Sequence, residues 1–364
     1  MTTTAPSGYS FPQFAAKSVL RAAARAILSG LVTWPSTPSQ EDGLTVIIGA
    51  AWRLPHVALA NLRFLSLQKA DCVREVLLVF DCLPGELPAD YPQRIAAVAG
   101  GLPVRCLFYT PRQVRIARTI DWGWIYSWMS WSLGIGACRT RLAMLHDLDA
   151  LLLRTDILQE RHDRIREHNC TYMGIGYYEG RHVIAADRLA KTFELTFNVN
   201  DVRSSVKPVD LFNRMAVIGG RRVEFDTFLH AQRLSGSVRV SPIDETDMVH
   251  PSQMICQFVD HVRRPVRVPT VNNLLMLPYY QFLGGDDSLL VSLSADLASS
   301  PDGSVKAWGR PLAAGRIGAA HADWLRKQTL RAESAARSGG PPDQRVLRYL
   351  DAIDAAVNQA APAR

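Results

Sequence analysis

Short, largely apolar runs alternate with segments of helical periodicity along the first half of the chain. The runs cover residues 44–50, 75–81 and 104–108, and helix-like segments lie around residues 56–67 and 91–99. A continuous apolar run is typical of a strand that is buried on both faces. Regular alternation of such strands with helices predicts a parallel, doubly wound α/β sheet with right-handed crossovers.

The pattern becomes less regular towards the C-terminus but still predicts strands and helices. The predicted strands cover residues 171–176 and 215–218, and the predicted helices cover residues 122–139, 251–262, 318–336 and 343–356. Pro251 is expected in the first turn of its helix, where the N–H that proline lacks is not needed. Residues 291–364 are expected to form a helical C-terminal extension.

The N-terminal segment predicts one helix over residues 14–32, apolar on one side and interrupted by Arg21 and Arg25. Two interpretations stay open. The helix packs on its own domain, or it lies on a membrane surface. The prolines of residues 34–40 then predict a linker, so residues 1–42 are expected to form an N-terminal helix and linker.

Two acids stand in the middle of the apolar run at residues 142–153, Leu-Ala-Met-Leu-His-Asp-Leu-Asp-Ala-Leu-Leu-Leu. Buried carboxylates are costly unless they are paired, protonated or bound to a metal, and a divalent cation is the simplest partner for two. In an extended segment alternate residues share a face, so Asp147 and Asp149 would reach one ion. The flanking residues indicate the carboxyl end of a strand, where open α/β sheets bind ligands. The alternative for the pair is a surface turn or a helix cap.

This arrangement resembles the Asp-x-Asp motif of nucleotide-sugar glycosyltransferases with the GT-A fold. In that family the motif follows an apolar strand, and its acids hold Mg²⁺ or Mn²⁺ against the diphosphate of the donor. The resemblance implies a GT-A-like α/β domain over residues 43–290, with a doubly wound, mostly parallel, Rossmann-like sheet and flanking helices. It also implies a nucleotide-binding half at residues 43–153 and an acceptor half at residues 154–290. Asp149 is expected to be the surer metal ligand, as the second acid is in the family.

The implied activity is metal-dependent transfer of a sugar from a UDP- or GDP-sugar to an acceptor hydroxyl. The acceptor could be a glycan, a lipid-linked molecule or a small molecule. Two alternatives stay open: a nucleotidyltransferase acting on a sugar phosphate, and a non-catalytic scaffold protein that binds nucleotide sugar. The nucleotidyltransferase is less favoured, because no Gly-rich, Lys-containing phosphate loop follows the first predicted strand.

Three further residues are candidates for donor binding beside the acid pair. Ala50 and Ala51 follow the first strand and are small enough for a nucleotide to approach the backbone. Asp81 ends the second strand, where dinucleotide-binding folds often place an acid near the base or ribose. The alternative for Asp81 is a turn-forming residue.

The segment from Asp244 to His250 carries the candidates for the remaining chemistry. The resemblance implies a further metal ligand in the C-terminal half, for which His250 is the candidate. It also implies a general base that takes the proton of the acceptor hydroxyl, with Asp247 and Glu245 preferred to Asp244. The alternative is a charged loop that caps the helix after it.

Composition limits the classes of partner. The net charge is +7, but no zinc finger, basic zipper or aromatic RNA-binding motif is present, so no nucleic-acid partner is expected. Six cysteines form no Cys-x-x-Cys pair, which indicates a reducing compartment. No apolar run reaches the roughly 18–20 residues of a membrane-spanning helix. We expect a cytoplasmic protein, with peripheral contact at the inner membrane face through residues 14–32 as the open alternative.

Overall fold

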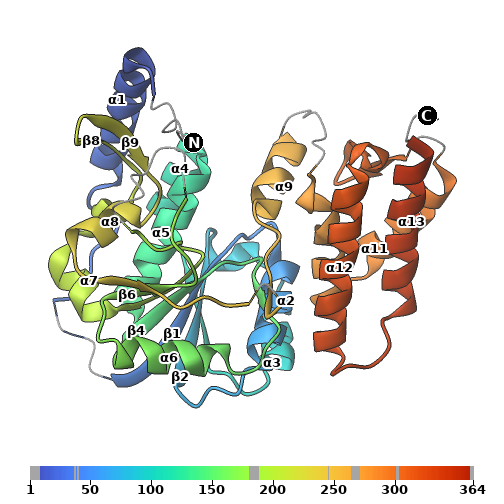
Figure 1. Cartoon of the computed structure of the whole chain (residues 1–364), viewed down its shortest axis with the longest axis horizontal. Coiled ribbons are helices and arrows are strands. Elements are labelled where there is room, and N and C mark those ends of the chain that lie inside the picture. The colour runs from blue at the N-terminus through green and yellow to red at the C-terminus, as the bar shows by residue number, and fades with distance from the viewer. Residues whose placement is uncertain are drawn as a thin grey trace, which may run out of the picture.

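The computed structural model describes residues 9–36, 38, 41–179, 188–244, 246–263, 271–300 and 303–360. Its centre is a seven-stranded sheet in the order β10-β6-β7-β4-β1-β2-β3 (Figure 1). The strands are β1 (Glu41–Ala50), β2 (Val73–Phe80), β3 (Val104–Phe108), β4 (Thr140–His146), β6 (Tyr172–Gly174), β7 (Glu194–Asn198) and β10 (Val238–Val240).

Four of these strands form the parallel half of the sheet. β1 pairs in parallel with β2 and with β4, and β2 pairs in parallel with β3. β7 is antiparallel to both β4 and β6, and β10 is parallel to β6. The predicted fold class, a mostly parallel α/β sheet with flanking helices, is confirmed.

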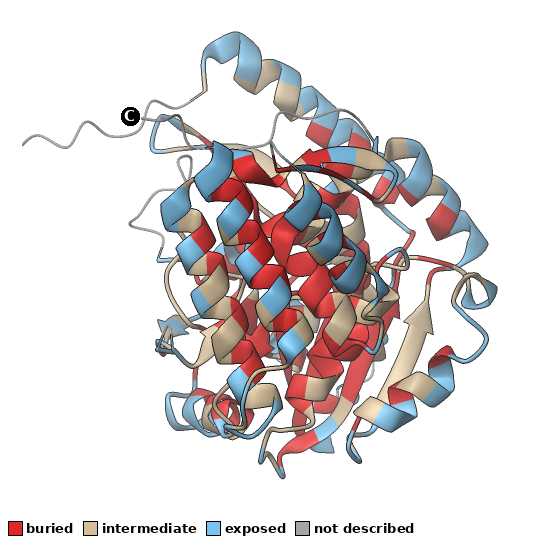
Figure 2. Ribbon diagram, turned by 90° about the vertical axis from the view of Figure 1, so that its right-hand side faces the viewer, coloured by how far each residue is buried: buried red, intermediate tan, exposed pale blue. Residues whose placement is uncertain are grey.

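Helices cover both faces of the sheet. Side chains of one strand alternate between the faces, so the apolar residues of β1 need a core on each side. Leu44, Val46 and Ile48 of β1 belong to a core built with α2 (Pro55–Leu65), α3 (Tyr91–Val98) and α6 (Ile157–Glu167). Ile47 belongs to the opposite core, built with helices α1 (Phe11–Leu28), α4 (Pro111–Ile120), α5 (Gly123–Ala137) and α7 (Val199–Ser205). Figure 2 shows the buried residues gathered on the sides of the helices that face the interior.

The C-terminal helices extend the first of these cores. They are α9 (Met254–Arg263), α10 (Leu277–Leu283), α11 (Ser288–Ser299), α12 (Ala319–Ala336) and α13 (Gln344–Ala360). α10 packs on α2, and α11 and α12 pack on α13, so the last helices stand beside α2 and α3 (Figure 1). The boundary predicted between the GT-A-like domain and the C-terminal extension, between residues 290 and 291, falls inside α11.

Short elements complete the chain. They are the hairpin β8 (Arg214–Ile218) and β9 (Arg221–Phe225), the helix α8 (Leu229–Leu234), the pair β5 (Leu151–Leu152) and β11 (Met248–Val249), and the hairpin β12 (Ser304–Ala307) and β13 (Arg310–Ala313). The helix predicted from Pro251 begins instead at Met254, because Pro251 to Gln253 form a turn in which Met254 N–H donates to the Pro251 carbonyl. All six cysteines are free thiols. No helix among the described residues is both long and apolar enough to cross a membrane.

The N-terminal helix α1 presents its basic residues to the domain. Lys17 Nζ lies 3.2 Å from Glu224 Oε2, and Arg21 Nη2 lies 3.1 Å from Glu224 Oε1. Arg25 Nη2 lies 2.8 Å from Asp210 Oδ1. The ion pairs therefore decide which side of α1 faces inward.

Candidate active site

The two acids of the apolar run lie in a turn directly after β4, not in the extended strand that the sequence predicted. Ala150 N–H donates to the Asp147 carbonyl over 3.1 Å, which closes a turn over residues 147–150. The turn still stands at the carboxyl end of a parallel strand, as predicted. The prediction of a shared strand face was wrong, because it is the turn that directs both carboxylates to one place.

His250 meets the acids in space. Its Nε2 lies 3.5 Å from Oδ2 of Asp147 and 3.5 Å from Oδ1 of Asp149. One ligand atom from each of the three residues fits within a span of 4.8 Å. Ligands of a Mg²⁺-sized ion sit at about 2.1 Å from it, so opposite ligands are roughly 4 Å apart. The three side chains are spaced to share one divalent ion.

A two-residue strand pair brings His250 to the turn. β11 is antiparallel to β5, with Val249 opposite Leu151 and Met248 opposite Leu152. His250 follows β11 and therefore lies opposite the residues that precede β5. The ring of Phe193 stacks on the imidazole, with centroids 4.3 Å apart, and holds it from one side.

The cluster is largely shielded from solvent. The side chain of Asp149 is 7% exposed and that of His250 is 12% exposed, whereas Asp147 keeps 33% and opens the cluster to solvent. Burial by itself lowers the pKa of His250, but hydrogen bonds and charge from the two carboxylates outweigh it and raise that pKa to about 10. Burial raises the pKa of Asp147, against the effect of His250. The two carboxylates thus stabilise the positive charge of the protonated His250 imidazole, and they could stabilise a divalent cation at the same place.

Asn61 of α2 supports the acid turn from inside the protein. Its Nδ2 lies 3.1 Å from the carbonyl oxygens of Asp147 and Leu148 and 2.8 Å from that of Ala150. Tyr280 of α10 adds a second support, because its hydroxyl donates to the Asp149 carbonyl over 2.6 Å. Neither residue was among the sequence candidates. For Asn61 the available signal was a lone amide inside an apolar helix.

His146 is buried behind the turn and takes no part in the cluster. Its Nε2 lies 3.1 Å from Asn61 Nδ2, and its Nδ1 is hydrogen-bonded to Glu194 of β7. Both side chains are 1% exposed. This pair fixes the last residue of β4, and with it the start of the acid turn.

The residues predicted to bind the sugar-nucleotide donor lie where the neighbouring strands β1 and β2 end. Asp81 N–H donates to the Ala50 carbonyl over 3.2 Å, and Asp81 Oδ1 accepts from Trp52 N–H over 2.7 Å. Burial raises the pKa of Asp81 to about 6. Guanidinium groups of Arg53 and Arg118 lie 5.3 Å and 5.2 Å from the Trp52 ring. Because β1, β2 and β4 are parallel, these residues share the carboxyl edge of the sheet with the acid turn.

Among the described residues of the segment from Asp244 to His250, the structure brings His250 alone to the cluster. Asp247 Oδ2 accepts from Arg154 Nε over 3.0 Å, and its carbonyl accepts from Leu153 N–H over 2.8 Å. Asp244 is exposed and accepts from the Thr246 N–H over 2.7 Å. Glu245 lies outside the described residues. The carboxylate of Asp247 therefore supports the β5–β11 pair, and that of Asp244 supports the loop before it.

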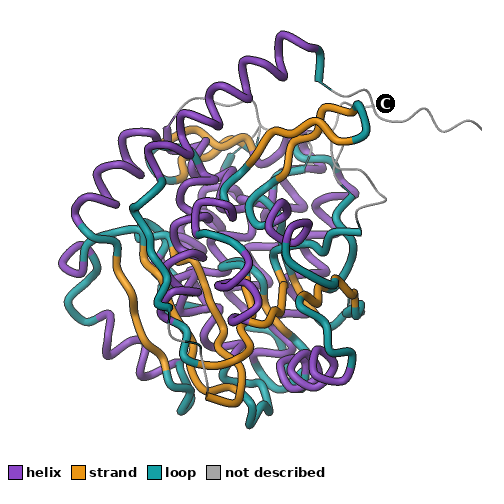
Figure 3. Tube along the Cα trace, turned by 90° about the vertical axis from the view of Figure 1, so that its left-hand side faces the viewer, coloured by secondary structure: helices purple, strands orange, loops and turns teal. Residues whose placement is uncertain are grey.

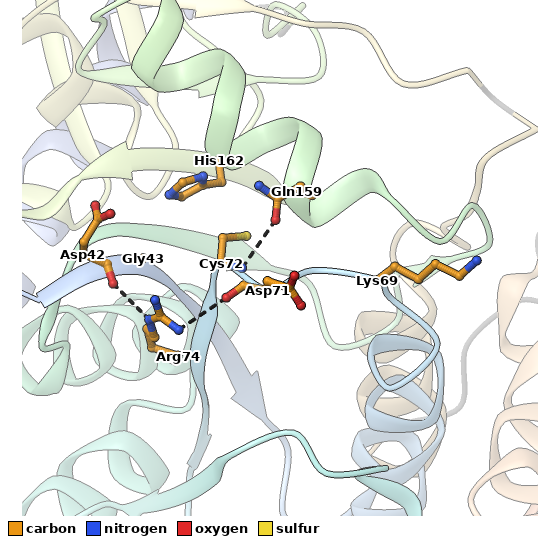
Figure 4. Close-up of a pocket in the computed structure, with 8 residues that line it drawn as sticks. All are labelled: Asp42, Gly43, Lys69, Asp71, Cys72, Arg74, Gln159 and His162. Carbon is orange, nitrogen blue, oxygen red and sulfur yellow. Dashed lines mark hydrogen bonds between the residues drawn. The ribbon is translucent and has the colours of Figure 1, made fainter.

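A cavity of about 400 Å³ lies at the opposite, amino-terminal edge of the sheet (Figure 4). Its lining residues are Asp42, Gly43, Lys69, Asp71, Cys72, Arg74, Gln159 and His162. Asp42 is the second residue of β1, at the amino-terminal end of that strand, whereas the acid turn follows the carboxyl end of β4. Several of the lining polar groups are already bonded, as in the contact from Arg74 Nε to the Asp42 carbonyl. The cavity is separate from the candidate site.

Comparison with known proteins finds no matching family model and no matching curated protein. Similar solved structures include residues 1–349 of TarS from S. aureus, at 12% identity over 88% of this chain and 93% of that one, with a TM-score of 0.39. The mannosyltransferase PcManGT from Pyrobaculum calidifontis, in complex with GDP-Man and Mn²⁺, is 13% identical over 97% of both chains, with a TM-score of 0.33. The galactosyltransferase LgtC, with donor and acceptor sugar analogs, is 13% identical over 45% of this chain and 60% of that one, with a TM-score of 0.32. At these scores the likeness is distant, and the chemistry of the site rests on its own residues.

Proposed function

We propose that the protein is a metal-dependent glycosyltransferase that moves a sugar from a nucleotide-sugar donor to an acceptor hydroxyl. The observation that carries the proposal is the convergence of Asp147, Asp149 and His250 at the carboxyl edge of the parallel sheet. Ligands are bound at this edge in open α/β sheets. The residues also form the Asp-x-Asp pattern that resembles the metal-binding motif of the GT-A family.

The donor set fits a hard divalent ion. Two carboxylates and one imidazole suit Mn²⁺ or Mg²⁺, and an ion held there would offset negative charge on a leaving diphosphate. Asp149 is fixed through its own carbonyl by Tyr280, so its carboxylate is presented from a rigid turn. Asp147 is the more exposed acid, so its carboxylate is the one that a donor phosphate could approach from solvent.

The nucleotide is proposed to bind where β1 and β2 end. Ala50 is buried and its carbonyl accepts from the Asp81 N–H, so Ala51, which is partly exposed, is the alanine that a nucleotide could approach. Asp81 offers a carboxylate that already accepts from the Trp52 N–H. Arg53 and Arg118 flank the Trp52 indole and place positive charge near a phosphate-bearing ligand.

The general base remains a prediction among Asp244, Glu245 and Asp247. Asp247 is held by Arg154, and Asp244 is held by Thr246. Either carboxylate would have to leave these partners to reach an acceptor hydroxyl within hydrogen-bond distance.

Calorimetry with UDP and GDP in the presence of Mn²⁺ tests the proposal, followed by donor hydrolysis across a panel of nucleotide sugars. We expect binding that requires the ion and is lost in Asp149→Asn, but kept in Asp163→Asn, a surface acid on α6. Equal nucleotide affinity with and without Mn²⁺ would contradict the metal site. Pyrophosphate release from a nucleoside triphosphate and a sugar phosphate would instead show nucleotidyl transfer. Binding without any turnover would support the non-catalytic alternative.

A further inference from the structure

One face of α1 is exposed and almost entirely apolar. The exposed residues of α1 are Phe11, Pro12, Gln13, Ala16, Val19, Leu20, Ala22, Ala23, Ala26 and Ile27. The large ones are strongly exposed, with Val19 at 69%, Leu20 at 52% and Ile27 at 51%. Soluble helices usually turn such a face inward and leave charged residues in water. α1 does the reverse.

The charged residues of α1 lie on the side of the helix that packs against the rest of the domain. Lys17 and Arg21 pair with Glu224 of β9, and Arg25 pairs with Asp210. The guanidinium of Arg21 also lies 4.0 Å from the ring centroid of Trp124. These contacts fix the rotation of the helix, so the apolar face cannot turn inward without breaking them.

The neighbouring hairpin continues the exposed apolar surface. Val217 of β8 is 61% exposed and pairs with Arg222 of β9, on the hairpin face that also carries Glu224 and therefore faces α1. Nine large hydrophobic side chains are strongly exposed among the described residues, and five of them lie on α1 and β8. They are Phe11, Val19, Leu20, Ile27 and Val217. We call α1 and the β8–β9 hairpin, with these residues, the apolar ridge.

The ridge is also the site of a local excess of positive charge. Its charged residues are Lys17, Arg21, Arg25, Arg214, Arg221, Arg222 and Glu224. Lys17, Arg21 and Arg25 are already paired with Glu224 and Asp210, and Arg214, Arg221 and Arg222 of the hairpin add positive charge beyond these pairs. A second copy of this chain would therefore bring like charges together. An anionic surface would be attracted, and exposed Arg221 at the hairpin turn is placed to meet it.

We propose that the apolar ridge docks the protein on an anionic lipid bilayer. The apolar face of α1 lies among the headgroups and upper acyl chains, and the hairpin arginines Arg214, Arg221 and Arg222 attract the anionic headgroups. Figure 3 shows α1 at the margin of the molecule, where a flat surface can reach it. The ridge stands beyond the carboxyl edge of the sheet, next to Trp124 at the start of α5 (Figure 1). This inference does not depend on the proposed transfer reaction.

Flotation of the full-length protein with vesicles tests the inference. The vesicles contain phosphatidylcholine alone or mixed with phosphatidylglycerol. We expect binding to the mixed vesicles, and a loss of about tenfold or more in the triple variant Val19→Gln, Leu20→Gln and Ile27→Gln, since burial of apolar area supplies most of the affinity. The matched control replaces Leu234, Val271 and Val291 with Gln. These three side chains are 53%, 51% and 46% exposed and lie outside α1 and the β8–β9 hairpin, so the control should bind like the parent.

Ionic strength and oligomeric state separate the alternatives. Salt should weaken the binding but not abolish it, because the apolar contact is not screened. Arg221→Gln should reduce the preference for phosphatidylglycerol. The inference is overturned if the parent does not float, or if the triple variant floats as well as the control. It is also overturned if the parent dimerises without lipid and the triple variant is monomeric, since a second copy then covers the ridge.

Discussion

The imidazole Nε2 of His250 lies 3.5 Å from Oδ1 of Asp149, although the two residues come from segments far apart in the chain. The contact depends on the antiparallel pair β5 and β11, which joins the residues after the acid turn to those before His250. The buried carboxylate of Asp149 and the partly exposed carboxylate of Asp147 gain a cationic partner in this way. The proposed function requires the same three side chains to exchange this pairing for a shared metal ion.

His250→Gln tests whether the histidine offsets the charge of the acids. We expect the variant to be less stable in EDTA by roughly 2–4 kcal/mol, because it leaves two acids without their cationic partner. Mn²⁺ should recover much of the loss, since an ion that binds only the folded state stabilises it. Thermal unfolding with EDTA and with Mn²⁺ measures both effects. His162→Gln, a histidine paired with a surface acid on α6, is the control and should show no such recovery. A variant as stable as the parent in EDTA would contradict this role.

Asn61→Leu tests the support of the acid turn. The substitution keeps the approximate size of the side chain but removes the amide that faces three turn carbonyls. We expect Mn²⁺ affinity to fall about 10–100-fold, as is usual when groups that orient metal ligands are removed. Stability should fall by about 1–3 kcal/mol.

Gln113→Leu separates these two effects of the Asn61 substitution. Gln113 is buried on α4 and donates to the Leu31 carbonyl over 2.8 Å, far from the turn in the fold. It should lose stability and keep the Mn²⁺ affinity of the parent. Equal affinities in the Asn61 and Gln113 variants would show that the turn holds its shape without the amide.

Asp81→Asn tests the pKa of the predicted donor acid. Burial raises the folded-state pKa of Asp81 to about 6, above the usual value near 4. The folded state therefore binds the proton more tightly than the unfolded state, and this group adds stability as the pH falls from about 6 to 4. The variant lacks that gain and should differ from the parent by on the order of 2 kcal/mol over the window, since one pKa unit is about 1.4 kcal/mol. Chemical unfolding at several pH values measures it, and parallel curves for both proteins would refute the assignment.

Asp247→Asn distinguishes a catalytic base from a support of the β5–β11 pair. Asp247 is bonded to Arg154 through its carboxylate and to Leu153 through its carbonyl, so we expect the variant to loosen the pair and weaken Mn²⁺ and donor binding several-fold. The control is Asp156→Asn, which removes a 60% exposed partner of the same arginine. If donor binding is unchanged while kcat falls about 100-fold or more, Asp247 is instead the base.

The sequence by itself determined the four parallel strands and the acid pair, but not the antiparallel strand β7 or the edge strand β10. Continuous apolar runs are typically buried on both faces, so the runs that became β1 and β2, followed by the half-buried β3, predicted a parallel sheet with helices on both faces. Asp147 and Asp149 were conspicuous because charged residues inside such a run need a partner. These conclusions depend on local chemistry alone and hold whatever the chain packs against.

Only the tertiary structure decided what each side chain meets. The sequence placed Arg21 and Arg25 on the polar side of a helix, but Glu224 and Asp210 turned that side inward and left the apolar side exposed. Asn61 became a support of the acid turn because α2 packs directly behind it. A periodic pattern tells which residues share a face, whereas the element opposite that face comes from distant sequence and is set by packing of the whole domain.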